Sequence, residues 1–105
     1  MSNVNFVTSL SEFQELIQTE NLTITNFHAD WCGPCKAIAP IFERLSEEFT
    51  EVQFLKVDSD DSEDITQEYH LTSVPAFILF KNGEKISFLG GANPPAMRKL
   101  IEEHQ

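Results

Sequence analysis

Hydrophobic and polar residues are arranged along this 105-residue chain with two different periods. Short apolar runs rich in Thr, Ile, Val and Phe predict strands, and longer segments with apolar residues three and four positions apart predict helices. The predicted strands cover residues 4–7, 22–29, 52–58, 76–81 and 85–89. The predicted helices cover residues 9–19, about 32–49, 62–69 and a closing segment that begins at residue 94.

Local signals support several of these elements. Ser9 and Glu12 have the spacing of a capping box at the start of the first helix. Asn82-Gly83 suits the tight hairpin turn in which both central residues have positive φ, so the last two strands should be antiparallel. Pro40 lies inside the second helix, where it interrupts the hydrogen-bond ladder and predicts a kink.

The order of elements, β-α-β-α-β-α-β-β-α, predicts the fold class. Parallel crossovers come first and a hairpin last, which indicates an α/β protein with one mixed sheet of about five strands and four helices on its two faces. No linker, repeat or low-complexity segment divides the chain, so residues 1–105 should form a single domain.

Composition and charge narrow the choice of partners. Seventeen acidic residues against seven basic ones give a formal charge of −10, which repels nucleic acid and anionic membranes. No apolar stretch is long enough to span a membrane, and the first residues do not resemble a secretory signal. We therefore expect a soluble, cytoplasmic, monomeric protein with no nucleic-acid or membrane partner.

Residues 58–68 carry the densest acidic stretch, with six carboxylates and no Lys or Arg. This segment is interpreted as a solvated helix start whose acids complement the helix dipole, in preference to a docking surface or a cation site. Calcium loops need a central glycine, which the segment lacks. No metal site is expected there.

The two cysteines, Cys32 and Cys35, are separated by Gly33-Pro34 and follow Trp31. In a reducing compartment such a pair indicates redox chemistry or metal binding. A zinc site needs four ligands, and the three histidines, His28, His70 and His104, do not have paired-ligand spacing. A purely structural disulfide closing so small a loop is also disfavoured. Redox catalysis is the favoured interpretation.

The predicted position of the pair suggests a role for each thiol. At a helix start, unpaired backbone N–H groups and the helix dipole favour the thiolate of Cys32 over its thiol. Cys35 lies one turn further on the same side and is expected to be less exposed, which suits a second, resolving thiol. Gly33 leaves the approach to sulfur open, and Pro34 pre-sets φ in the first turn.

At these residues the chain resembles the thioredoxin family. The likeness runs from about Phe6 to the final helix, and the motifs keep the family's order and spacing. They are Phe27, Ala29, Trp31-Cys32-Gly33-Pro34-Cys35-Lys36, Ile38-Ala39-Pro40, Val74-Pro75-Ala76-Phe77, Phe80-Lys81-Asn82-Gly83 and Gly90-Gly91-Ala92.

The resemblance implies a thioredoxin fold and a protein disulfide reductase. Cys32 would attack a substrate disulfide and Cys35 would resolve the mixed disulfide, leaving a Cys32–Cys35 redox disulfide. Thioredoxin reductase, drawing on NADPH, would then restore the dithiol, with no cofactor bound to this chain. The partners would be this reductase and proteins that contain disulfides.

The resemblance also implies a docking surface made by Trp31, Val74, Pro75 and Gly91. In the family the proline matching Pro75 is cis and lies against the cysteines, so the backbone of Val74 can pair with an extended substrate. A proline at this place in a chain is otherwise more often an edge or turn residue. Trp31 should be exposed, although a buried tryptophan is the alternative. The phenylalanines and isoleucine of the central strands, Phe27, Phe77, Ile78 and Phe80, are expected to be core.

Two residues depart from the family's pattern. Asn26 stands where most members carry a buried aspartate beneath the second cysteine, and an amide does not exchange protons near neutral pH. His28 stands where an aromatic is usual, on the same strand face as Asn26. We hypothesise that His28 replaces part of the proton transfer, held by Asp58 or Asp60. The simpler interpretation is that Asn26 only removes the cost of a buried carboxyl group and His28 only fills space.

Three further interpretations concern the side chain of Lys56 and two alternative functions. Lys56, which in the family lies near the buried aspartate, should extend toward solvent here. The fold also permits a binding module that docks partners through Trp31 and Pro75, with incidental redox activity. Within redox chemistry an oxidase or isomerase is the other alternative, and the reductase-like Gly33-Pro34 dipeptide argues against it.

Overall fold

The structure, a computed structural model, describes residues 2–105. Its elements are β1 (Val4–Phe6), α1 (Leu10–Leu16), β2 (Thr23–His28), α2 (Gly33–Glu48), β3 (Gln53–Asp58), α3 (Glu63–Glu68), β4 (Ala76–Lys81), β5 (Glu84–Gly90) and α4 (Pro94–His104). The predicted order β-α-β-α-β-α-β-β-α is confirmed.

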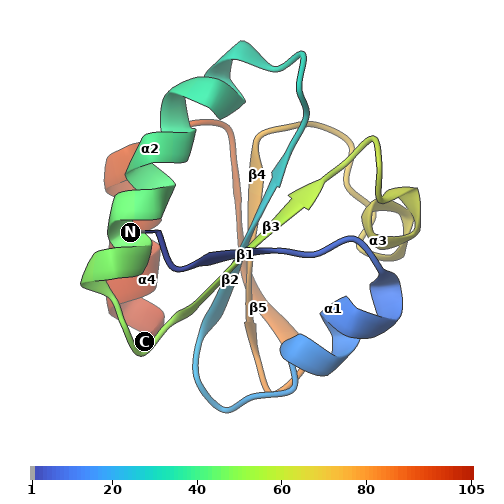
Figure 1. The fold of residues 1–105 in the computed structure, drawn as a ribbon. Coiled ribbons are helices and arrows are strands. Elements are labelled where there is room, and N and C mark those ends of the chain that lie inside the picture. The colour runs from blue at the N-terminus through green and yellow to red at the C-terminus, as the bar shows by residue number, and fades with distance from the viewer. Residues whose placement is uncertain (1) are drawn as a thin grey trace.

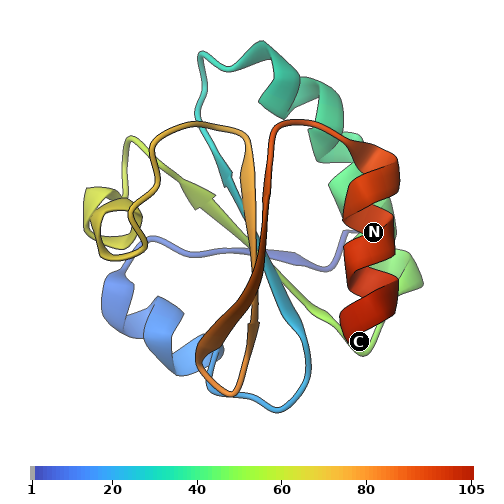
Figure 2. The same cartoon turned by 180° about the vertical axis from the view of Figure 1, so that it is seen from behind.

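The strands form one mixed sheet in the order β1-β3-β2-β4-β5. β3 is parallel to both β1 and β2, whereas β4 is antiparallel to β2 and β5 is antiparallel to β4. Helices α1 and α3 cover one face of this sheet, and α2 and α4 cover the other (Figure 1). The reverse view shows the same division, with α4 beside α2 (Figure 2).

Each face of the sheet has its own apolar core. Because successive strand residues point to opposite faces, alternate residues of β2 and β4 enter different cores. The predicted core residues of these strands, Phe27, Phe77, Ile78 and Phe80, are all fully buried. On the α2 and α4 side, the Phe42 ring contacts Phe54 and Phe77, with centroids 5.1 and 5.8 Å away. On the α1 and α3 side, Phe13 lies at the centre of an aromatic group with Phe27, Tyr69 and Phe80.

The first helix is shorter than predicted because its end binds the hairpin. α1 ends at Leu16, whereas the sequence pattern extends to residue 19. The carbonyl of Ile17 accepts a hydrogen bond from the Gly83 N–H at 2.9 Å, and that of Thr19 accepts one from the Asn82 N–H at 2.8 Å. These contacts give the carbonyls partners outside the helix, and Ile17 remains buried in the core.

The predicted cap of the first helix and the predicted hairpin turn are confirmed. The Ser9 hydroxyl accepts a hydrogen bond from the Glu12 N–H at 3.2 Å and caps α1. Asn82 and Gly83 have φ values of 53° and 80°, as the hairpin turn requires. α2 continues through Pro40 to Glu48, and the kink expected at Pro40 stays a prediction.

Candidate active site

The cysteine pair lies where β2 passes into α2. Cys32 is the N-cap of α2, with φ −88° and ψ 106°, and Cys35 lies in its first turn. The two residues form a disulfide across a Cα–Cα distance of 5.3 Å, which lies in the usual range for such bonds. The Cys35 N–H donates a hydrogen bond to Cys32 Sγ at 3.1 Å. This donor is one of the unpaired N–H groups of the helix start, and it points at the sulfur that would carry negative charge.

Both cysteines are buried against apolar neighbours. Their exposed fractions are 3% for Cys32 and 4% for Cys35, so the expectation that Cys35 is the less exposed residue is not supported. The disulfide packs against Ala29 and Val74. The two cysteines are therefore equally buried, and the neighbouring residues determine how a substrate reaches each sulfur.

The residues predicted for docking lie together at this end of the sheet. Val74 contacts the disulfide cluster, and the peptide bond between Val74 and Pro75 is cis. The Gly91 N–H donates to the Pro75 carbonyl at 2.9 Å, and Gly91 has a φ of 83°. The structure thus brings Val74, Pro75 and Gly91 to the side of the cysteines.

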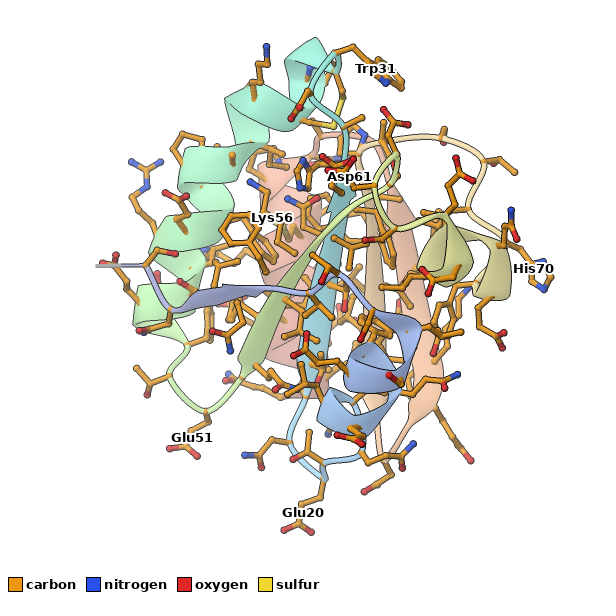
Figure 3. All side chains as sticks on the ribbon, turned by 45° about the vertical axis from the view of Figure 1, so that its right-hand side comes forward. Glu20, Trp31, Glu51, Lys56, Asp61 and His70 are labelled. Atoms are coloured by element: carbon orange, nitrogen blue, oxygen red, sulfur yellow. A yellow bond between two sulfur atoms is a disulfide. The ribbon has the colours of Figure 1, made fainter. Side chains whose placement is uncertain are left out.

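Trp31 is a surface residue. It is 72% exposed, and its Nε1 donates a hydrogen bond to Asp60 Oδ2 at 2.9 Å. Figure 3 shows its ring at the end of the molecule that holds the disulfide, opposite Glu20 and Glu51. The alternative of a buried tryptophan is therefore wrong. Gly33, Pro34 and Lys36, which complete the motif, are also exposed.

Asn26 and His28 lie on the sheet face that α2 covers. Asn26 is fully buried, and neither atom of its amide has a hydrogen-bond partner among residues 2–105. The same holds for His28 Nε2. Buried polar atoms normally have partners, so three such atoms on one strand face are unusual. Cys35 belongs to the buried stripe of α2 that packs on this face, together with Ile38 and Phe42.

Lys56 and Asp58 flank these two residues across the sheet. In the parallel register of β2 and β3, Lys56 is opposite Asn26 and Asp58 is opposite His28. The Lys56 ammonium extends over the exposed ring of Phe6, 5.5 Å from its centroid, as expected for a lysine that reaches toward solvent.

The charges around His28 act in opposite directions on its pKa. Burial lowers the pKa of His28 below the ordinary value of 6.5, and Lys56 lowers it further, while Asp58 and Asp30 raise it. Sequence reasoning had named Asp58 and Asp60 as partners. Asp58 lies beside His28, but Asp60 binds Trp31 instead, and Asp30 was missed. The spacing of Asp30, two residues after His28, was the signal available for it.

The side chains of His28, Asp30 and Asp58 have donor atoms within 4.8 Å of one another. Among the residues that the structure describes, this is the group that could approach a metal ion. The nearby Lys56 ammonium opposes a cation at the same place, as its effect on His28 indicates. We therefore interpret the group as a set of interacting titratable residues.

The chemistry of the site defines a class of protein. A pair of thiols that can form a disulfide can pass two electrons to another disulfide. This is the reaction of a thiol–disulfide oxidoreductase.

Comparisons with known proteins identify the family. The family model for thioredoxin matches residues 4–103 of this chain. Thioredoxin 1 of Plasmodium falciparum is 44% identical over 101 residues, covering 96% of this chain and 97% of that protein. Thioredoxin-1 of Schizosaccharomyces pombe is 42% identical over 99 residues, covering 94% and 96%. The structure of P. falciparum thioredoxin superposes with a TM-score of 0.92 at 42% identity, covering 96% of this chain and 99% of that one.

The chain belongs to the thioredoxin family and has its fold. Its activity is that of a protein disulfide reductase, and neither the binding-module nor the oxidase interpretation is favoured. Thioredoxins need no bound cofactor, and the family implies a reductase and disulfide-containing proteins as partners. No helix among residues 2–105 is long and apolar enough to cross a membrane.

Proposed function

We propose that Cys32 is the attacking thiol and Cys35 the resolving thiol of this reductase. The observation that carries the proposal is the hydrogen bond from the Cys35 N–H to Cys32 Sγ at the start of α2. A donor in that position stabilises a thiolate at Cys32, and the thiolate is the nucleophile in disulfide exchange.

The reaction has two exchange steps. The Cys32 thiolate attacks one sulfur of a substrate disulfide, forms a mixed disulfide and releases the other substrate sulfur as a thiolate, which takes up a proton. Cys35 then loses its proton and attacks Cys32 Sγ. The Cys32–Cys35 disulfide forms as the second substrate thiolate leaves and is protonated. Two electrons pass from this chain to the substrate.

The surrounding residues have supporting roles. Val74 offers backbone groups to an extended substrate segment, while Trp31, Pro75 and Gly91 form the walls of the docking surface. Gly33 leaves the sulfur accessible, Pro34 sets the first turn of α2, and Lys36 places an exposed positive charge in that turn.

The electrons come from an NADPH-dependent thioredoxin reductase, which converts the Cys32–Cys35 disulfide back to the dithiol. The chain acts as an electron carrier in the cytoplasm, as a monomer whose residues 1–105 form one domain. The coupled assay with insulin, NADPH and a thioredoxin reductase tests this: NADPH consumption should require both cysteines. If Cys32→Ser supports the same rate as the unchanged protein, the proposed order of attack is wrong.

His28 takes up the proton that Cys35 releases, directly or through water, in this proposal. Two observations support this role of His28. His28 Nε2 and the side-chain amide of Asn26 have no hydrogen-bond partner among residues 2–105, and both lie on the sheet face against which the buried side of α2, with Cys35, packs. An amide bonded to water on this face positions the water without exchanging a proton itself. Burial, the largest effect, and Lys56 lower the pKa of His28, while Asp58 and Asp30 favour the protonated ring.

Reductase assays between about pH 5 and about pH 9 test the role of His28. In His28→Phe the rate of the resolving step should fall and lose its dependence on pH near neutrality. Asn26→Asp in the same background returns a titratable group and should restore part of the rate. His104→Phe, at the end of α4, is the matched control and should leave the profile unchanged. An unchanged profile in His28→Phe would overturn the relay.

A further inference from the structure

A groove of about 580 Å³ lies between α2 and α4, the two helices that Figure 2 shows side by side. One stripe of each helix lines it. The lining residues are Ile41, Arg44, Leu45 and Glu48 of α2, and Pro94, Pro95 and Arg98 of α4. Ile41 comes six residues after Cys35, which is about 9 Å along the helix axis. The groove is therefore separate from the redox site.

Apolar side chains form much of the groove surface. Leu45 is buried in the core beneath the two helices, and Ile41 is half-buried against the same core. Pro94 and Pro95 form the first turn of α4, and a proline has no N–H to offer a ligand. These four residues present carbon atoms rather than hydrogen-bond donors, so they suit a hydrocarbon group.

The only two arginines of the chain, Arg44 and Arg98, both line this groove. Arg98 already has a partner, because its Nη1 and Nη2 donate to the two carboxylate oxygens of Glu48, each at 2.6 Å. Its guanidinium also lies 5.5 Å from the ring centroid of Phe49. Arg44 is exposed, and its guanidinium has no ion pair or hydrogen bond with residues 2–105. Of the charged side chains in the groove, Arg44 is therefore the one available to an anion.

An apolar groove with one available cation favours a particular kind of ligand. Sites for small molecules have volumes of about 300 to 1,000 Å³ and are mostly apolar, with a few polar groups that fix the orientation of the ligand. A guanidinium matches the planar geometry of a carboxylate. The formal charge of −10 repels an acidic protein segment that brings several charges, but it opposes a single carboxylate much less.

We propose that this groove binds a small amphipathic carboxylate, with one carboxylate group on an unbranched hydrocarbon chain of medium length. The carboxylate pairs with Arg44, and the hydrocarbon chain lies against Ile41, Leu45 and the two prolines. This assigns to the chain a ligand site apart from its cysteines, and the site does not depend on which cysteine attacks first.

Titration of the oxidised protein with sodium decanoate, below the concentration at which micelles form, tests the site by NMR of methyl groups. The signals of Ile41 and Leu45 should shift along one saturable curve. The signals of Ile86, an exposed isoleucine on β5, should stay in place. Octanoate should bind more weakly than decanoate, by up to about four-fold for each methylene that no longer lies in the groove.

Two variants separate the groove from the overall charge. Arg44→Gln and Lys99→Gln each remove one positive charge from an exposed side chain, but Lys99 does not line the groove and pairs with Glu103 at 4.0 Å. Arg44→Gln should weaken decanoate binding by about two- to five-fold, as expected for one exposed charge pair. Lys99→Gln should leave the affinity nearly unchanged.

The opposite results would overturn the proposal at different points. Unchanged signals of Ile41 and Leu45 would show that the groove binds no such ligand. Shifts that do not saturate, or that Ile86 shares, would show adsorption to exposed apolar surface instead. Equal affinities in Arg44→Gln and Lys99→Gln would exclude a pairing of the carboxylate with Arg44. The reductase function stands apart from these outcomes, because the coupled insulin assay measures it separately.

Discussion

Trp31 Nε1 donates a hydrogen bond of 2.9 Å to Asp60 Oδ2, which ties the residue before the first cysteine to the loop after β3. The bond explains how a side chain that is 72% exposed can keep a defined position beside the disulfide. Trp31 is also the single tryptophan of the chain, so tryptophan fluorescence reports on this side chain alone.

Removing the acceptor should free the indole ring. We expect Asp60→Ala to lower the fluorescence anisotropy of Trp31 and to reduce the free energy of unfolding by less than about 1 kcal/mol, because the contact is exposed. Asp60→Asn retains an acceptor and should keep the anisotropy of the unchanged protein. Equal anisotropy in all three proteins would show that the bond does not restrain the ring.

Gly91 and Gly33 form a matched pair for testing backbone conformation. An added Cβ would meet nothing within 4 Å at either position, but Gly91 has a φ of +83° and Gly33 does not have a positive φ. Gly91→Ala should therefore lose about 1 to 2 kcal/mol of unfolding free energy, while Gly33→Ala should change by less than about 0.5 kcal/mol. Urea unfolding of the oxidised proteins measures both, and equal losses would contradict the assignment of the cost to φ.

The lowered pKa of His28 predicts how stability depends on pH. Burial, with Lys56, holds the folded-state pKa below 6.5, so the unfolded chain binds a proton before the folded one does. The contribution to stability is complete above the unfolded pKa and is lost as pH falls through the folded pKa. Denaturant unfolding from about pH 8 to about pH 5 should give a smaller loss of stability in His28→Gln than in the unchanged protein. A parallel pH dependence in the two would show that His28 is not shifted.

Much of the fold was accessible from the sequence because its signals are local. The period of the apolar residues indicated each element, and Asn82-Gly83 indicated the antiparallel hairpin. The end of α1 was not accessible, since it depends on hydrogen bonds from Asn82 and Gly83, more than sixty residues later in the chain.

The residues of the candidate site could be predicted from the sequence, but the contacts between their side chains could not. The cysteine motif gave the redox pair, and its resemblance to a family gave Val74, Pro75 and Gly91. The contact between Trp31 and Asp60, and the approach of Asp30 to His28, depend on where side chains point after the chain has folded. The buried atoms of Asn26 and His28 that lack partners among residues 2–105 are likewise a property of packing rather than of residue type.

The most direct test of the account is to trap the mixed disulfide. Cys35→Ser removes the resolving thiol, so an equimolar disulfide substrate should accumulate as an adduct attached to Cys32, located by peptide mass spectrometry. Cys32→Ser, the matched variant, should form little adduct at Cys35. Adducts found mainly at Cys35, or none in Cys35→Ser, would contradict the assignment of Cys32 as the attacking thiol.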